Sequence, residues 1–348
     1  MKALLLAEYK RLELTDLPAP TPGPDEVLIR VAACGICGSD VHGYDGSTGR
    51  RIPPIVMGHE AAGTVAALGE DVRGFSDGDR VTFDSTVYCG GCAYCRRGLV
   101  NLCDDRQIVG VSTPDFRRHG AFSEYVTVPA RIVYRLPDEL SFAHAAMLEA
   151  VSVALHAVEL SKPASASPVL VIGAGMIGLL TLQALRAEGF PCVFIADLDE
   201  SRLRFAAQLG AAATFQASGP DLLAQVLAAT NNEGVNLAIE CVGRDETVRG
   251  AIDAVRKGGT VTLVGNIRPE VTLPLQKVVS RQIRLQGSAA SAGEYPRAIE
   301  LLSSGAVQVA PLITAVAPLE EGPRWFERLY AGEPNLMKVV LTPETSHV

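Results

Sequence analysis

Basic runs are absent from this 348-residue sequence: none is longer than two residues, and the nearest approaches are Arg96-Arg97 and Arg117-Arg118. The formal net charge is −8, and the isoelectric point is near 5.4. Proteins that bind the phosphate backbone of nucleic acids normally carry a basic face. We therefore expect no nucleic-acid partner.

Long apolar runs are also missing, since none approaches the 18 residues of a membrane-spanning helix. We therefore expect no membrane association. The apolar start Met1–Leu6 meets Glu8 and Lys10 too early to form the core of a secretory leader. The eight cysteines are then expected as thiolates in a reducing compartment rather than as disulfides, which favours a cytoplasmic protein.

Short segments with strand character dominate the first 150 residues. Gly, Pro and Asp separate them, and many short strands with turns between them indicate a partly closed β-barrel. The expected strands are 27–33, 61–67, 80–83 and 121–128.

The pattern changes after a small polar linker at Ser161–Pro168. The run Val169–Ile172 is apolar throughout, as in a strand that is buried on both faces of a parallel sheet. Strands then alternate with helices, which predicts an α/β domain with a doubly wound parallel sheet. The expected strands are 193–196, 237–241, 260–264 and 284–287, and the expected helices are 201–209 and 221–229.

The length predicts about two domains. We expect residues 1–158 to form a barrel-like catalytic domain with a cysteine-rich lobe at about 87–105, and residues 159–291 to bind a nucleotide. The tail ends in a strand at 338–341 and resembles the first region in texture. Residues 292–348 are therefore expected to return to the catalytic domain.

A glycine pattern, Gly173-Ala-Gly175-Met-Ile-Gly178, follows the strand Val169–Ile172 and opens an apolar helix. The first glycine allows a tight turn, the second lets a pyrophosphate approach the backbone, and the third allows close packing of helix on strand. Asp197 ends the next strand 19 residues after Gly178, where an acidic side chain binds ribose hydroxyls. The alternative role for Asp197 is a helix N-cap.

The acid at Asp197 would repel a 2′-phosphate, so the sequence favours NAD over NADP. A nearby arginine can accommodate that phosphate, but we interpret Arg202 as packing on the adenine or pairing with Asp197. The expected cofactor contacts are Gly173, Gly175, Met176, Ile177, Gly178, Asp197 and Arg202, with Val242, Val264, Gly265 and Asn266 after two later strands.

Four thiols lie within fifteen residues, at Cys89, Cys92, Cys95 and Cys103. They can close around one Zn²⁺ as a tetrahedral all-thiolate site with no open position. A site of this kind is structural. A catalytic metal would need a second, open site.

A second set of donors is present at Cys37, His59, Glu60 and Glu149. The segments Cys37-Gly-Ser-Asp-Val-His42 and Gly58-His-Glu60, together with the cysteine lobe and the glycine pattern, resemble the zinc-dependent medium-chain dehydrogenase/reductase superfamily. The resemblance covers essentially the whole chain. It is greatest to the polyol dehydrogenases, of the sorbitol/L-iditol and galactitol-1-phosphate types, and it implies a GroES-like barrel beside a Rossmann domain.

The resemblance implies a zinc bound by Cys37 and His59, with Glu60, Glu149 or a water held by one of them completing the site. Two zinc ions per chain are then expected, one catalytic and one structural. The usual Glu-Pro pair of the family is replaced by Glu149-Ala150, which removes a backbone constraint beside that ligand.

Further roles are implied by the same resemblance. Zinc would lower the pKa of a substrate hydroxyl, the nicotinamide would take a hydride, and the proton would leave through Ser39, the nicotinamide ribose and His42. The alternative for His42 is an ordinary surface histidine. Asp40 is expected to hold a zinc ligand or a cation, with Lys338 as its partner.

The expected reaction is oxidation of a secondary hydroxyl of a polyol or polyol phosphate to a ketone. Arg117 and Arg118, in the segment Phe116–His119, suit a sugar phosphate, although a solvated loop has the same composition. L-Threonine or another secondary alcohol is the alternative substrate. A catalytically idle zinc-binding interaction protein is the alternative from another class, and the resemblance also implies homodimers or homotetramers.

Overall fold

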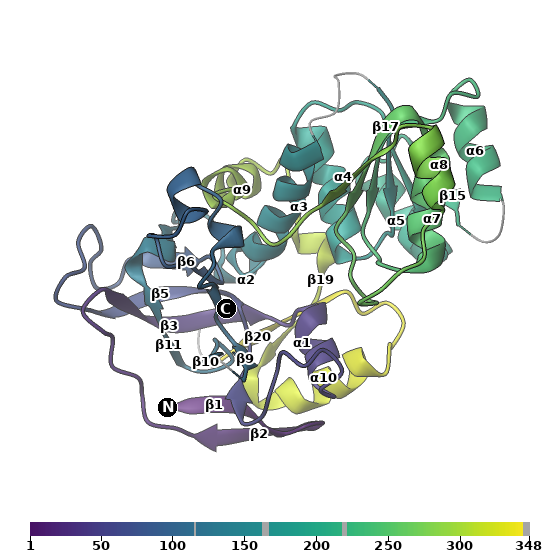
Figure 1. Cartoon of the computed structure of the whole chain (residues 1–348). Coiled ribbons are helices and arrows are strands. Elements are labelled where there is room, and N and C mark those ends of the chain that lie inside the picture. Colours follow the sequence, from purple (N-terminus) through teal and green to yellow (C-terminus); the bar gives the residue numbers. More distant parts are fainter. Residues whose placement is uncertain (115, 162–166, 218–220, 344–348) are drawn as a thin grey trace. The chain divides into compact units, whose positions relative to one another are not determined.

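The computed structural model describes residues 1–114, 116–161, 167–217 and 221–343. Most of the predicted linker at 161–168 lies outside the described residues. By its internal contacts the chain forms two compact units, which are Met1–Glu149 with Ser291–Val348, and Ala150–Ala290 (Figure 1). Helix α3 (Leu148–Ser161) begins at the end of one unit and continues in the other.

The first unit is built on a sheet with the strand order β12-β6-β5-β3-β20-β19, and β11 also pairs with β3. In β3 the side chains of Val27, Ile29 and Val31 are buried, because alternate residues of a strand face the same side. The strands are β1 (Lys2–Glu8), β2 (Arg11–Asp16), β3 (Glu26–Gly35), β4 (Ile55–Val56), β5 (Glu60–Leu68), β6 (Arg80–Phe83), β7 (Thr86–Val87), β8 (Gln107–Ile108), β9 (Val111–Thr113), β10 (Phe116–Arg118), β11 (Tyr125–Pro129), β12 (Val133–Arg135), β19 (Ile313–Pro318) and β20 (Lys338–Thr342).

The last strand joins this sheet. β20 is antiparallel to β3, with Val340 opposite Gly35, and β3 is antiparallel to β5, with Gly35 opposite Glu60. Three segments far apart in the sequence therefore meet at one end of the sheet. The helices of the unit are α1 (Gly38–Gly43), α2 (Phe142–Ala145), α9 (Tyr295–Ser303) and α10 (Gly322–Tyr330).

Two local predictions for this unit were wrong. The segment predicted as a loop at 116–119 contains β10, which pairs with β9 through Phe116 opposite Thr113. The strand predicted at 121–128 is shorter and begins at Tyr125, because Ala121 and Phe122 instead bond the backbone of Met57 and Gly58.

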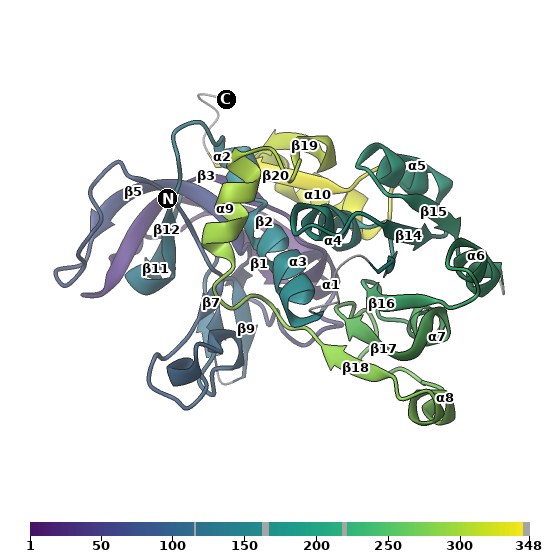
Figure 2. The same ribbon diagram turned by 90° about the horizontal axis from the view of Figure 1, so that it is seen from above.

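The second unit confirms the predicted doubly wound sheet. Its six strands are all parallel, in the order β15-β14-β13-β16-β17-β18. Figure 2 shows helices on both faces, with α4 and α5 on one side and α6 and α7 on the other. The elements are β13 (Val169–Ile172), β14 (Val193–Asp197), β15 (Ala213–Gln216), β16 (Val235–Glu240), β17 (Val255–Leu263), β18 (Arg284–Gly287), α4 (Met176–Ala187), α5 (Glu200–Gln208), α6 (Asp221–Ala229), α7 (Asp245–Ala254) and α8 (Leu275–Ser280).

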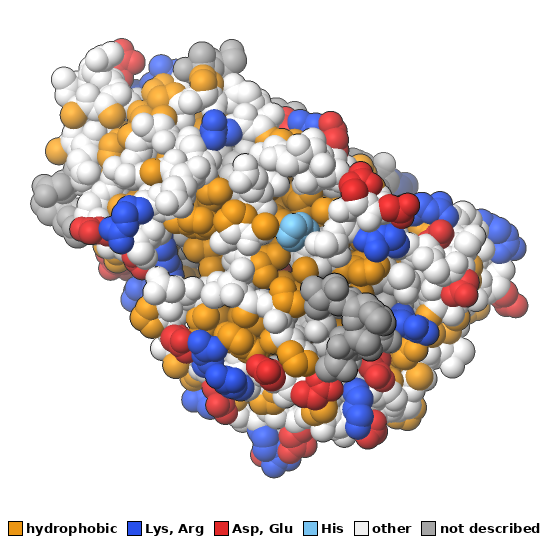
Figure 3. Space-filling model, turned by 180° about the vertical axis from the view of Figure 1, so that it is seen from behind, with side chains coloured by type: hydrophobic (Ala, Val, Ile, Leu, Met, Phe, Trp, Pro, Cys, Tyr) orange, Lys and Arg blue, Asp and Glu red, His pale blue; other side chains and the backbone are white. Residues whose placement is uncertain are grey.

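One helical stretch, Phe142–Ser161, has the length and apolar composition of a membrane span. The sequence criterion, an uninterrupted apolar run of 18 residues, therefore missed this candidate. Helices α2 and α3 follow each other closely here and together form one long apolar stretch. In the most apolar window of this stretch, 67% is buried inside the structure, as in a helix of a protein core. On the face shown in Figure 3, positive and negative side chains are interspersed and no extended basic area is visible.

Candidate functional site

Cys37 is held at the junction between β3 and α1. It is the N-cap of α1, and its sulfur accepts a hydrogen bond from the Ser39 N–H at 3.4 Å. The Asp40 carboxylate accepts one in return from the Cys37 N–H, also at 3.4 Å. This reciprocal capping fixes the direction of the Cys37 side chain.

His59 and Glu60 stand at the start of β5, directly after Gly58. Gly58 has a φ of +94°, which favours glycine. A Cβ at this position would also lie 2.8 Å from the Phe122 nitrogen and 2.9 Å from the Cys34 sulfur. The close approach explains the glycine, and it places His59 beside α1. Cys34 itself is buried in the core.

The structure brings Cys37, His59 and Glu60 together, with one donor atom of each within 4.8 Å of the others. A thiolate, an imidazole and a carboxylate with a remaining open position are the donor set of a catalytic zinc. The three residues therefore fit the metal that the sequence implies. Glu149 does not belong to this compact cluster.

The predicted partner of Lys338 was wrong. Lys338 Nζ lies 2.5 Å from Glu60 Oε2 and donates a second hydrogen bond to the Ile36 carbonyl at 3.1 Å. Both charged side chains are buried. The reason is that β20 and β5 both pair with β3, so that Glu60, opposite Gly35, and the side chain of Lys338 meet beside Gly35. A Cβ on Gly35 would lie 2.5 Å from Glu60 Oε2.

Asp40 pairs instead with Arg51 and His59. Arg51 donates to Asp40 Oδ1 from Nε at 3.2 Å and from a terminal nitrogen at 2.9 Å, and His59 Nδ1 lies 3.4 Å from the same oxygen. Burial opposes the charged form of Asp40, but His59 and Arg51 hold its pKa well below the usual range. The sequence analysis missed Arg51, because a single basic residue in a loop carries no local signal.

The two residues predicted to relay a proton lie on α1. Ser39 Oγ is 3.5 Å from His59 Nε2, so Ser39 reaches the cluster. His42 is exposed in the last turn of α1, and its carbonyl accepts a hydrogen bond from Ser47. Within the described residues, no hydrogen bond links Ser39 directly to His42.

Glu149 occupies the first turn of α3. The residue as a whole is half-buried, but its carboxyl group is enclosed, and this burial raises its pKa to about 7. The net value includes the charges of Glu60 and Asp84, which add to the effect of burial, and those of His59 and Lys338, which oppose it. Glu149 is therefore a carboxyl group with access to both protonation states near neutral pH.

The second metal group is the cysteine lobe. The sulfurs of Cys89, Cys92, Cys95 and Cys103 lie within 4.8 Å of one another, and none of them forms a disulfide. Cys89 accepts hydrogen bonds from the N–H groups of Gly91 and Cys92, and Cys92 accepts one from Cys95. Backbone donors that point at sulfur stabilise thiolates.

Without a cation, the four thiols cannot all ionise together. Backbone N–H groups lower the pKa of Cys89 and bring that of Cys92 to about 6, whereas burial raises that of Cys95 to about 12. A divalent cation removes this conflict, because it stabilises every coordinating thiolate. The all-sulfur set therefore fits a closed structural zinc.

The glycine loop after β13 is built for a phosphate. Gly173 has a φ of +99°, and a Cβ on Gly178 would overlap the Gly173 carbonyl oxygen. These two glycines are required by the turn and by the packing of α4. Gly175 is different, since a Cβ there would meet nothing within 4 Å. The space beside the N-terminus of α4 is open to a ligand phosphate. Met176 and Ile177 form the first turn of α4.

Asp197 ends β14, and its carboxylate organises this loop. Oδ2 accepts the Ala174 N–H at 2.6 Å, and Oδ1 accepts the Asp199 N–H at 2.9 Å. The helix N-cap is Asp199, not Asp197. The prediction that Arg202 pairs with Asp197 was wrong, because the Arg202 guanidinium lies 3.8 Å from Asp199 in the first turn of α5.

The loops after β16 and β17 pack backbone against backbone. A Cβ on Gly265 would overlap the backbone of Val242, and one on Gly243 would lie 2.5 Å from the Asn266 nitrogen. Val264 and Asn266 therefore adjoin Val242, as expected for two loops at the carboxyl edge of one sheet. The sequence analysis missed Glu240, whose buried carboxylate accepts the N–H groups of Val242 and Gly243 at 2.8 Å.

Arg117 and Arg118 are occupied by protein groups. Arg117 donates to the carbonyls of Pro54 and Ile52, at 2.9 and 3.4 Å. Arg118 lies 2.5 Å from Glu26 and also donates to the Thr127 carbonyl. The contacts explain both arginines as structural residues of the β10 hairpin.

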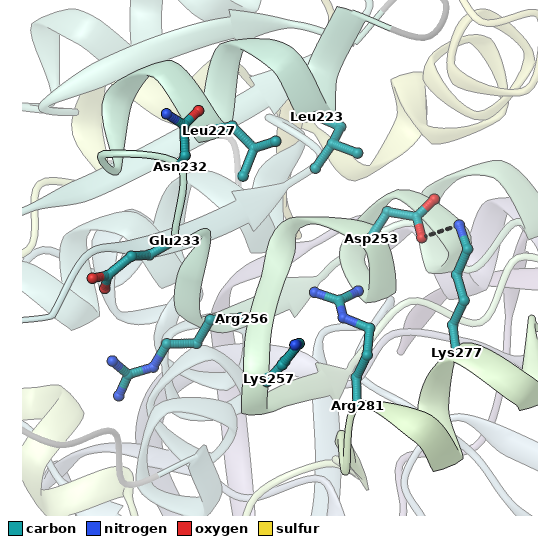
Figure 4. Close-up of a pocket in the computed structure, with 9 residues that line it drawn as sticks. All are labelled: Leu223, Leu227, Asn232, Glu233, Asp253, Arg256, Lys257, Lys277 and Arg281. Carbon is teal, nitrogen blue, oxygen red and sulfur yellow. Dashed lines mark hydrogen bonds and ion pairs between the residues drawn. The ribbon is translucent and has the colours of Figure 1, made fainter.

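A pocket of about 530 Å³ lies in the second unit, near the amino ends of β16 and β17 (Figure 4). The dinucleotide loops lie at the opposite, carboxyl edge of the same sheet. Lys277 is paired with Asp253 at 2.6 Å, and Arg281 donates to the carbonyl of Ile252. The pocket is therefore separate from the cofactor site, and part of its positive charge is already compensated.

Comparisons with known proteins agree with this geometry. Residues 23–138 match the family described as Alcohol dehydrogenase GroES-like domain, and residues 177–304 match the family described as Zinc-binding dehydrogenase. A sorbitol dehydrogenase of Bacillus subtilis is 35% identical over 347 residues, which cover 99% of this chain and 97% of the relative.

Two solved structures share the fold over nearly their whole length. One, from Sinorhizobium meliloti 1021, is described as a zinc-binding dehydrogenase bound to NADP, with a TM-score of 0.89, 33% identity and coverage of 98% and 99%. The other is a galactitol-1-phosphate dehydrogenase of Escherichia coli, with a TM-score of 0.90, 27% identity and coverage of 99% and 100%. The chain is an alcohol dehydrogenase with a zinc-binding catalytic domain, and it belongs to the polyol dehydrogenase branch of the zinc-dependent medium-chain dehydrogenase/reductase superfamily.

Proposed function

We propose that this enzyme oxidises a secondary hydroxyl of an unphosphorylated polyol to a ketone, with NAD⁺ as the hydride acceptor. The observation that carries the proposal is the compact cluster of Cys37, His59 and Glu60 in a chain with a dinucleotide loop. The sorbitol dehydrogenase relative supports a polyol substrate. The occupied guanidinium groups of Arg117 and Arg118 weaken the case for a phosphorylated one.

The residues of the cluster have distinct roles in this reaction. Bound zinc acts as a Lewis acid that lowers the pKa of the substrate hydroxyl. Ser39 Oγ, beside His59, would accept the hydroxyl proton and release its own to the nicotinamide ribose. From the ribose the proton would reach solvent through the exposed His42. Lys338 neutralises one oxygen of Glu60 and leaves the other for the metal or for a water. The compact cluster favours Glu60 over Glu149 as the third donor.

NAD is the proposed cofactor because the Asp197 carboxylate ends β14 at the position of the adenosine ribose. The pairing of Arg202 with Asp199 also directs that cation away from a 2′-phosphate site. The NADP found in the Sinorhizobium meliloti structure makes NADP the competing cofactor. Asp197→Ala should raise the kcat/KM for NADP⁺ relative to NAD⁺.

The test is a kinetic panel of purified enzyme with sorbitol, xylitol, galactitol, galactitol 1-phosphate, L-threonine and 2,3-butanediol, each with NAD⁺ and with NADP⁺. We expect the highest kcat/KM for a free polyol with NAD⁺. A preference for the phosphorylated polyol, or for NADP⁺, would refute that part of the proposal. No turnover of any alcohol by protein that contains two zinc ions would favour an idle relative.

We further infer a reducing compartment and a homo-oligomer. All eight cysteines are unbridged, which fits the cytoplasm. In the second unit, β18 is an edge strand, and α8 before it exposes Leu275 and Val279 by 66% and 68%. An apolar surface beside an open strand edge suits association between copies. Light scattering of the purified protein would give the assembly size, and a monomer would contradict the inference.

A further inference from the structure

Arg51 is a buried cation at the edge of the catalytic cluster. Only 4% of its surface is exposed, although arginine is almost never buried without a partner. It follows the loop after α1, and its backbone forms an isolated bridge with Ser112. Taking a guanidinium out of water costs several kcal/mol unless charged and polar groups surround it. Its contacts therefore identify what it stabilises.

Those contacts converge on α1. Besides the two hydrogen bonds to Asp40, a terminal nitrogen of Arg51 donates to Ser39 Oγ at 3.4 Å. The other terminal nitrogen donates to the Arg50 carbonyl at 3.2 Å. Arg51 thus contacts Asp40, which lies near His59 Nδ1, and the Ser39 hydroxyl, which lies near His59 Nε2.

Gly43, the last residue of α1, leaves space for the Arg51 side chain. A Cβ on Gly43 would overlap Arg51 Cγ and would lie 3.1 Å from Arg51 Cβ. Gly43 does not need to be glycine for a positive φ, since it is absent from the left-handed glycines of the chain. The small residue at position 43 and the large cation at position 51 therefore fit each other.

We propose that Arg51 is a positioning residue of this dehydrogenase, which holds Asp40 and Ser39 in place so that His59 is fixed toward the metal and Ser39 toward the substrate hydroxyl. Asp40 orients the imidazole, and the Arg51 charge keeps that buried carboxylate in one place. The bond to Ser39 Oγ uses one lone pair, so the Ser39 hydrogen points away from Arg51. The inference rests on the cluster being the zinc site, but not on which alcohol is oxidised.

The test compares Arg51→Met, Arg51→Lys and Gly43→Ala in the zinc-loaded enzyme. Loss of a residue that orients metal ligands typically costs about 10–100-fold in metal affinity or activity. We expect Arg51→Met to release its catalytic zinc to a chelator about tenfold faster or more, and to lower kcat with little change in the Kd for NADH. Arg51→Lys should recover part of both losses, because an ammonium can reach Asp40 but cannot match the guanidinium fork.

Gly43→Ala distinguishes positioning from general stability. If Gly43 only makes room for Arg51, Gly43→Ala should reproduce the faster zinc release. The double variant Gly43→Ala/Arg51→Ala, which lacks the Cγ that the new methyl group would meet, should be no worse than Arg51→Ala alone. Arg11→Met, which removes an exposed arginine paired with Glu13 in the same unit, is the matched control and should leave zinc release unchanged.

Wild-type zinc release and kcat in folded Arg51→Met would overturn the proposal, as would additive effects in the double variant. If Arg51→Met does not fold, Arg51→Lys and Gly43→Ala decide the matter by the same two measurements. Zinc release needs no substrate, so a failure of the polyol assignment leaves this test intact. Zinc release as slow as in the wild type in every variant would contradict the positioning role of Arg51. Absence of turnover with any alcohol would separately contradict the proposed function.

Discussion

Lys338 and Glu60 form a buried ion pair, 2.5 Å from nitrogen to oxygen, that joins the last strand of the chain to a ligand of the catalytic cluster. The residues are 278 positions apart in the sequence. Burial opposes the charge of Lys338, but Glu60 and Cys37 more than offset this and raise its pKa. The C-terminal strand therefore contributes a charged neighbour to the cluster of Cys37, His59 and Glu60.

Lys338→Met should lower the free energy of unfolding of the chelator-treated protein by about 3–5 kcal/mol, because it leaves the Glu60 carboxylate buried without its cation. Urea unfolding measures the effect. Lys2→Met is the matched control in the same unit: its pair with Asp16 is exposed to solvent, so its loss should change the free energy of unfolding far less. Equal effects of the two substitutions would show that the buried pair does not stabilise the site.

Cys37→Ser should reduce the zinc content from two ions per chain to one and abolish alcohol oxidation, since a thiolate ligand of the open site is lost. Metal analysis by mass spectrometry after dialysis provides the count. Cys34→Ala, which removes a neighbouring buried thiol outside the cluster, should retain both ions. Two zinc ions and full activity in Cys37→Ser would refute the ligand assignment.

The glycines of the dinucleotide loop should separate stability from binding. Gly178→Ala forces a methyl group against the Gly173 carbonyl and should cost about 1–3 kcal/mol of stability. Gly175→Ala places its methyl in open space, so stability should stay nearly unchanged. NADH affinity should nevertheless fall about tenfold, which corresponds to the loss of one hydrogen bond to a charged phosphate group. Urea unfolding and NADH fluorescence titration measure the two effects; unchanged NADH binding in Gly175→Ala would place the pyrophosphate elsewhere.

His119 should make stability fall in mild acid. Partial burial and the charge of Arg117 lower its pKa, and its Nδ1 accepts a hydrogen bond from the Val56 N–H at 3.1 Å. Because the unfolded state takes up the proton first, stability is full above the unfolded pKa of about 6.5 and decreases as pH falls below it toward the folded pKa. The loss is complete below the folded pKa.

His119→Asn keeps an acceptor for Val56 without a titrating ring. Its urea-unfolding free energy should therefore change less than that of the wild type between pH 7.5 and pH 5. His144→Asn serves as a control, because His144 takes part in α2 through its backbone. The same pH slope in wild type and His119→Asn would show that the ring does not contribute.

Local patterns allowed much of the protein to be predicted. The four cysteines lie within fifteen residues, so any compact loop brings their sulfurs together. The strand Val169–Ile172 and the helix after the glycine pattern were also predicted correctly, because one strand, one turn and one helix form with few long-range contacts. Gly58 directly precedes His59 in the sequence. Because Gly58 has no side chain, the backbone before this predicted metal donor can pass close to Phe122 and Cys34.

The pairing of charges around the open metal site came only with the tertiary structure. From the sequence, Lys338 was the predicted partner of Asp40, and no local pattern pointed to Arg51. The pairing of β20, β3 and β5 brings Lys338 next to Glu60, and the space left by Gly43 lets the Arg51 side chain reach Asp40. Ion pairs between distant residues have no sequence period, because they depend on which strands become neighbours. Sequence motifs therefore predict Cys37 and His59 as metal donors, while strand register and side-chain space determine which charged residues lie beside them.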